Sequence, residues 1–144
     1  MEEAAARLQG TFHGVRPCAE LDRFGAPAPW HEWARDGELQ CLRSIEGTID
    51  GMPHALVQLR YSVRQRRGEE QPDAWYEVTV AALQRPGGAA GAALVPLAAA
   101  EGYQAMQNGR ALFLWKKGSP GAGASLDAAE LPSLLEQARR TPTR

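Results

Sequence analysis

The 144-residue sequence is poor in cysteine, in surplus charge of either sign and in long apolar runs. Its Lys+Arg total of 16 stands against 17 for Asp+Glu, which gives a net charge of −1 and a pI near 6.3. Because this balance creates no overall field, we expect neither nucleic acid nor an anionic membrane as a partner. The acidic opening "MEEAAARLQG" lacks the basic start and apolar run of a secretory signal. The composition therefore predicts a cytoplasmic protein without a membrane span.

The two cysteines, Cys18 and Cys41, have neither the CxxC spacing of a zinc ribbon nor the density of a disulfide framework. We interpret both as reduced thiols, with Cys41 on the buried face of a strand. The motif "HEW" at 31–33 has no second histidine on the same helical face. The stretch "GGAAGAAL" lacks the lysine and the serine or threonine of a phosphate-binding loop. We therefore predict no metal site and no cofactor.

The amino-acid composition, with 44% hydrophobic and 23% charged residues, is typical of a folded protein, and we expect one domain spanning 1–144. Residues 2–9 combine good helix formers and are expected to form a short helix that ends at Gly10. The segment 11–37 is rich in turn-forming residues, and we expect an irregular wrap over the core. The alanine- and glycine-rich segment 85–102 is expected to be a flexible connection.

A β-hairpin is predicted by "IEGTIDGMPHALVQLRYSV" at 45–63. Its second half alternates strictly and places on one inward face Ala55, Val57, Leu59, Tyr61 and Val63. A two-residue Asp50-Gly51 turn would oppose Ala55 to Glu46 and mix polar with apolar residues. A three-residue turn with a bulge at Gly51 would instead oppose Ala55 to Ile45, and we prefer this bulged turn.

The remaining elements are a strand at 74–83, a hairpin around Asn108-Gly109 and an amphipathic helix that begins near Leu131. Pairing Tyr61 with Val78 would join the apolar faces of the second and third strands. The resulting fold class is α+β: an antiparallel sheet of about five strands, with a short N-terminal and a longer C-terminal helix packed on one face.

Two groups of residues are candidate sites. Aromatic and imidazole side chains could line a pocket between the 11–37 wrap and the sheet: Trp30, His31, Trp33 and Tyr61. A basic patch could form at the tip of the hairpin between the second and third strands: Arg60, Arg64, Arg66 and Arg67. Nearby glutamates offset the charge of this patch, so we expect surface pairing there and not nucleic-acid binding.

The hairpin at 45–63, followed by "YEVTVAAL", "GRALFLWKKG" and "LDAAELPSLLEQA", resembles a pattern in uncharacterised small α+β proteins of high-GC bacteria, chiefly actinobacterial. This resemblance covers roughly 40–140, consists of structural residues and transfers no catalytic motif. The order of helices and strands is also similar to that of type III secretion chaperones, which implies a small dimeric protein without enzymatic activity.

The leading hypothesis is a non-enzymatic cytoplasmic interaction or scaffolding protein, because no paired catalytic constellation is encoded and the sheet is expected to keep one face free. Its partner would be another protein or a second copy of the chain, joined through a strand at the edge of the sheet. The competing hypothesis is a small-molecule-binding module or an enzyme whose pocket lies between the 11–37 wrap and the sheet.

Overall fold

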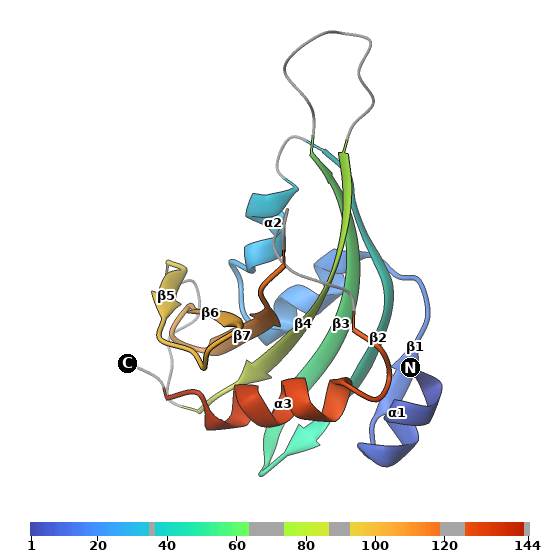
Figure 1. Ribbon diagram of the computed structural model, residues 1–144, viewed down its shortest axis with the longest axis vertical. Coiled ribbons are helices and arrows are strands. Elements are labelled where there is room, and N and C mark those ends of the chain that lie inside the picture. Colours follow the sequence, from blue (N-terminus) through green and yellow to red (C-terminus); the bar gives the residue numbers. More distant parts are fainter. Residues whose placement is uncertain (35–36, 64–73, 87–92, 119–125, 143–144) are drawn as a thin grey trace, which may run out of the picture.

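A seven-stranded antiparallel sheet in the order β1-β2-β3-β4-β7-β6-β5 organises the chain in the computed structural model (Figure 1). The structure describes residues 1–34, 37–63, 74–86, 93–118 and 126–142. The α+β class is confirmed. The expected number of about five strands was too low because β1 and β5 are only three residues long, too short to give a periodic pattern.

The sheet consists of Thr11–His13 (β1), Leu39–Ile49 (β2), Met52–Val63 (β3), Ala74–Gln84 (β4), Val95–Leu97 (β5), Tyr103–Gln107 (β6) and Ala111–Lys116 (β7). The helices are Glu2–Arg7 (α1), the 3₁₀ helix Cys18–Phe24 (η1), Pro29–Trp33 (α2) and Leu131–Arg140 (α3). The predicted wrap at 11–37 is therefore more regular than expected, since it contains β1, η1 and α2. Part of the predicted connection at 85–102 lies outside the described residues, and its described part contains β5.

Helices cover both faces of the sheet, so the prediction of one free face was wrong. Figure 1 shows α3 lying across one face and η1 with α2 behind the other. On the α3 side, the leucines of the amphipathic helix pack on Ile45, Leu56 and Leu112. On the other side, Leu21, Phe24 and Trp30 are among the core residues packed with Val57, Leu59 and Phe113. Because both faces are covered, the even-numbered Leu56 is as buried as its odd-numbered neighbours.

The β2–β3 hairpin turns at Asp50-Gly51, both with positive φ (52° and 78°), so Ile49 pairs with Met52. The preferred three-residue turn was therefore wrong, and Ala55 lies opposite Glu46. Positive φ at two successive positions is typical of the type I′ turn, which matches the twist of the strands. The bulge exists, but it lies between Cys41 and Arg43, and beyond it Cys41 pairs with Leu59.

The β3–β4 ladder is shifted by two residues from the prediction, because Tyr61 pairs with Tyr76 and Leu59 with Val78. A shift of two keeps every side chain on its expected face. Val63 pairs with Ala74 at the far end of this ladder, whereas β7 reaches β4 only from Val80 onward. The end of the β3–β4 hairpin consequently extends beyond β7 (Figure 1).

A disulfide joins Cys18 of η1 to Cys41 of β2, with 5.3 Å between the two Cα atoms. The prediction of two reduced thiols was wrong for this structure. The backbone N–H of Arg16 donates to the carbonyl of Cys41, which brings the segment before η1 alongside β2. The disulfide therefore fastens the N-terminal segment to the sheet next to a backbone bridge, a proximity that the spacing in the sequence does not reveal.

Candidate functional site

Two of the four predicted pocket residues belong to the core. Trp30 is 0% exposed and its ring packs edge-on against Phe113, with 5.4 Å between the ring centroids. Tyr61 is also buried, between the rings of Trp33 and Tyr76 at 5.9 Å and 5.5 Å. These contacts make Trp30 and Tyr61 packing residues that a ligand could not reach without rearrangement of the core.

The other two predicted residues, His31 and Trp33, do line a pocket. Its volume is about 600 Å³, and its walls come from α2, the segment before it and the edge of the sheet: Pro27, Ala28, Pro29, His31, Glu32, Trp33, Leu94 and Met106. His31 Nε2 lies 2.8 Å from Asp22 Oδ1, which orients the ring. An apolar pocket of this size with a few polar side chains is typical of a small-ligand site.

A polar cluster surrounds Glu46 on β2. Its carboxylate accepts hydrogen bonds from Arg16 and Arg23, and lies 3.0 Å from His13 Nε2. The carboxylate and the Arg16 guanidinium are both largely removed from solvent. Paired charges of this kind stabilise the position of the segments that carry them. We therefore interpret the cluster as a fastening of β1 and η1 to β2.

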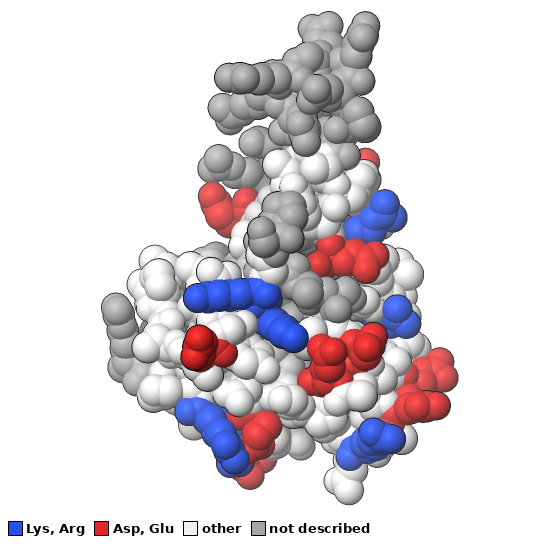
Figure 2. Space-filling model, viewed as in Figure 1, with Lys and Arg blue, Asp and Glu red and all other residues white. Residues whose placement is uncertain are grey.

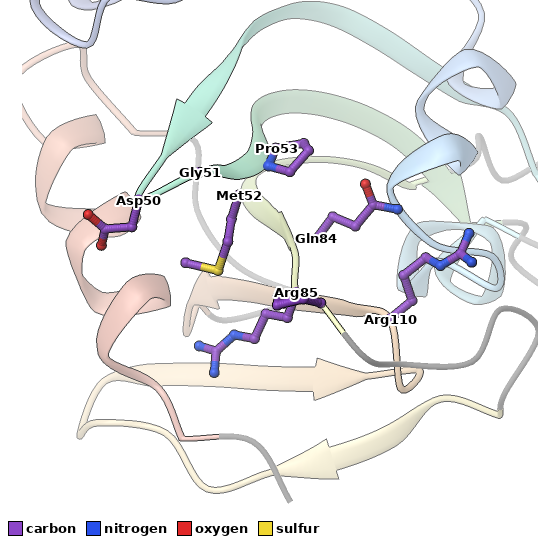
Figure 3. Close-up of a pocket in the computed structure, with 8 residues that line it drawn as sticks. Asp50, Gly51, Met52, Pro53, Gln84, Arg85 and Arg110 are labelled. Atoms are coloured by element: carbon purple, nitrogen blue, oxygen red, sulfur yellow. The ribbon is translucent and has the colours of Figure 1, made fainter.

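A second pocket, of about 550 Å³, lies where the β2–β3 turn approaches the end of β4 (Figure 3). Arg85 and Arg110 line it, but Figure 3 shows their guanidinium groups pointing in different directions. The Arg85 guanidinium donates to the carbonyls of Ala138 and Thr141, at 3.0 Å and 2.5 Å. It therefore caps the C-terminus of α3, where a cation is favoured. The two arginines do not converge on a common anion.

His54 on β3 follows Pro53 at the start of the strand, so the sequence predicts it at the surface, and this prediction was wrong. Its side chain is 1% exposed, and neither ring nitrogen has a hydrogen-bond partner among the described residues. Gly47 lies against the ring: a Cβ there would come within 3.2 Å of Cε1 of His54. Burial lowers the pKa of His54 from its ordinary value of 6.5, because the charged form loses its hydration.

We expect the free energy of unfolding to decrease as the pH falls below about 6.5, in part through His54. The sign follows because the unfolded chain takes up the proton at a higher pH than the folded chain. Urea unfolding of the His54→Leu variant at a series of pH values measures this contribution. The slope in the acidic range should be shallower than in the wild type. His31→Gln serves as the exposed control, and an unchanged slope in His54→Leu would contradict the assignment.

The far end of the β3–β4 hairpin exposes large apolar side chains. Val63 and Trp75 are each 39% exposed, and the Arg60 guanidinium lies 4.2 Å from the centroid of the Trp75 ring. Arg60 is thus the one member of the predicted basic patch within the described residues; Arg64, Arg66 and Arg67 lie outside them. Over the face that Figure 2 shows, acidic and basic side chains are interspersed among the described residues.

Within the described ranges, no group of three or more His, Cys, Asp or Glu side chains is arranged to hold a metal ion. The helices described there are also too short and too polar for any of them to cross a membrane. Comparison with protein-family models, with curated proteins and with solved structures found no match to this chain.

Proposed function

We propose that this protein is a non-enzymatic interaction protein that docks a partner on the far end of the β3–β4 hairpin. The observation that carries the proposal is the exposure of Trp75 and Val63 where the hairpin extends past β7. Aromatic residues with an adjacent arginine are enriched at protein interfaces, because they bury a large area at little cost in conformational entropy. Arg60 stacked on Trp75 has this composition.

Photo-crosslinking in the native cell tests the proposal. Benzoylphenylalanine in place of Trp75 should yield a discrete adduct with another protein. The same group in place of Val15, an apolar side chain that is 81% exposed and lies away from the hairpin, should not. Equal labelling from both positions, or no adduct from position 75, would count against a docking surface on the hairpin.

The non-enzymatic part of the proposal has its own test. His31 lines the α2 pocket and forms an acid–base pair with Asp22, 2.8 Å away, so it is the residue to test for catalysis. Turnover of a broad hydrolase substrate panel that disappears in His31→Ala would overturn the proposal.

A further inference from the structure

Among the described residues, backbone groups at the outer edge of β4 have no partner strand. The β3–β4 ladder runs from Val63↔Ala74 to His54↔Leu83, but β7 pairs only with Val80–Gln84 of β4. In the part of the chain that the structure describes, no strand lies beside 74–78 on the β7 side. Unpaired edges of this kind are templates for another extended segment.

Two backbone hydrogen bonds determine which residues of β4 direct their N–H and C=O groups to the open edge. The N–H of Ser62 donates to the carbonyl of Glu38, toward β2, so Ser62 and Trp75 form a pair without mutual hydrogen bonds. The N–H and C=O of Trp75 therefore point away from β3. At the other end of β4, the N–H of Arg85 donates to the carbonyl of Arg110, on the β7 side. Since the register between these points has no shift, Glu77 also presents its N–H and C=O to the open edge.

We propose that an extended peptide segment of a partner protein adds to the sheet along 74–78 of β4, hydrogen-bonded to the backbone of Trp75 and Glu77. Alternate N–H and C=O groups along an edge are matched by one kind of ligand, another chain in the β conformation. This inference rests on the proposed function and names the class of partner and the way in which it binds.

The neighbouring side chains define the sequence that fits. On one face the added strand would meet Tyr76, with Trp33 and Trp115 packed beside each other at 4.8 Å nearby, so apolar residues suit that face. On the other face it would meet Trp75 and Glu77. Glu77 is exposed and lies opposite Arg60, whose guanidinium is placed over the Trp75 ring. A basic residue beside Glu77 would complement its charge. The fitting segment alternates apolar residues with basic or polar ones.

A second copy of the chain is a poorer occupant of this edge. If two copies pair antiparallel about a twofold axis at Tyr76, the backbone of Trp75 in one copy bonds to that of Glu77 in the other. In that register Glu77 of each copy lies opposite Trp75 of the other, so neither carboxylate meets a basic residue on the added strand. An axis at Glu77 would place two like carboxylates opposite each other. A peptide with a basic residue opposite Glu77 complements its charge in either register.

Selection of short random peptides displayed on phage against the full-length protein tests the inference. Enriched peptides should alternate apolar and basic or polar residues. Upon addition of a selected peptide, the amides of Trp75 and Glu77 should become protected from hydrogen exchange, since they face the open edge. The amides of Tyr76 and Val78, which face β3, should already be protected in the free protein.

The variant Glu77→Pro removes one outward N–H and leaves the β3 ladder intact, as edge strands tolerate. It should weaken binding of a selected peptide by about fivefold or more, from the lost hydrogen bond. Glu77→Gln keeps the N–H and should lose mainly the preference for basic residues. Equal binding to Glu77→Pro, protection at other amides, association of the chain with itself through β4, or the absence of enriched peptides would each overturn the inference. A crosslinked partner at position 75 together with any of these results would leave the proposed function standing.

Discussion

Removal of the Cys18–Cys41 disulfide is expected to lower the free energy of unfolding by about 3 kcal/mol. The bond closes a loop with a sequence separation of 23, and its loss returns the corresponding conformational freedom to the unfolded chain. The expected loss is a large share of the stability of an ordinary domain. Urea unfolding of the oxidised protein, with and without dithiothreitol, measures it.

The double variant Cys18→Ala, Cys41→Ala is the matched control for this prediction. It should unfold at a lower urea concentration than the oxidised wild type, and dithiothreitol should not change its midpoint. If the wild type shows the same midpoint with and without reductant, and titration detects two free thiols throughout, the disulfide is absent in solution.

The oxidation state of Cys18 and Cys41 also bears on the cellular compartment of the protein. Disulfides persist mainly in oxidising compartments and are rare in the cytoplasm. The predicted cytoplasmic location stays a prediction, and the Cys18–Cys41 bond argues against it. Thiol titration immediately after lysis under denaturing, alkylating conditions would report the state of the pair in the cell.

Trp30→Ala is expected to destabilise the protein by about 3–5 kcal/mol, because truncation of a buried aromatic ring leaves a cavity. Trp30 is fully buried and is held edge-on against Phe113 in the core on the η1 and α2 side of the sheet. Thermal and urea unfolding measure the loss. A loss of this size would establish Trp30 as a packing residue and not as part of a ligand site.

Two variants calibrate this prediction. Trp75→Ala makes the same chemical change at a side chain that is 39% exposed, and should cost no more than about 1 kcal/mol. Trp30→Phe should be much milder than Trp30→Ala, because the buried indole N–H has no hydrogen-bond partner among the described residues. Equal losses for Trp30→Ala and Trp75→Ala would contradict the placement of Trp30.

Alternation predicted the strands of the β2–β3 and β3–β4 hairpins, and helical periodicity predicted α3, but the preferred β2–β3 turn was wrong and the β3–β4 register was two residues off. The helix begins at Leu131 as expected, and it is amphipathic, with one buried stripe made of Leu131, Leu134, Leu135 and Ala138. The position of the bulge could not be predicted, because it lies next to the bridge between Arg16 and Cys41 and far from the turn. A local argument could only place the extra residue at the turn, where glycine permits it.

The candidate sites were harder to predict, because side chains separated along the sequence come together only in the fold. Cys18 and Cys41 become neighbours through the path of η1, which has no periodic signal. His54 follows a turn and a proline, so it was expected at the surface, yet the residues packed around β3 bury it. The open edge of β4 depends on where β7 ends, which only the complete sheet reveals.

Proline at the centre of β5 limits how far the sheet can grow. The N–H of Asn108 donates to the carbonyl of Ala111, toward β7, whereas the N–H of Tyr103 donates to the carbonyl of Ala100, away from β7. Because backbone groups alternate in direction along a strand, those of Met106 point to β7. Its partner Pro96 therefore directs its backbone groups away from β6, to the outside of the sheet. The one residue of β5 directed to solvent therefore has no amide hydrogen to offer. Addition of a further strand at this border is therefore disfavoured, and the unpaired stretch of β4 is the better edge for an extended segment.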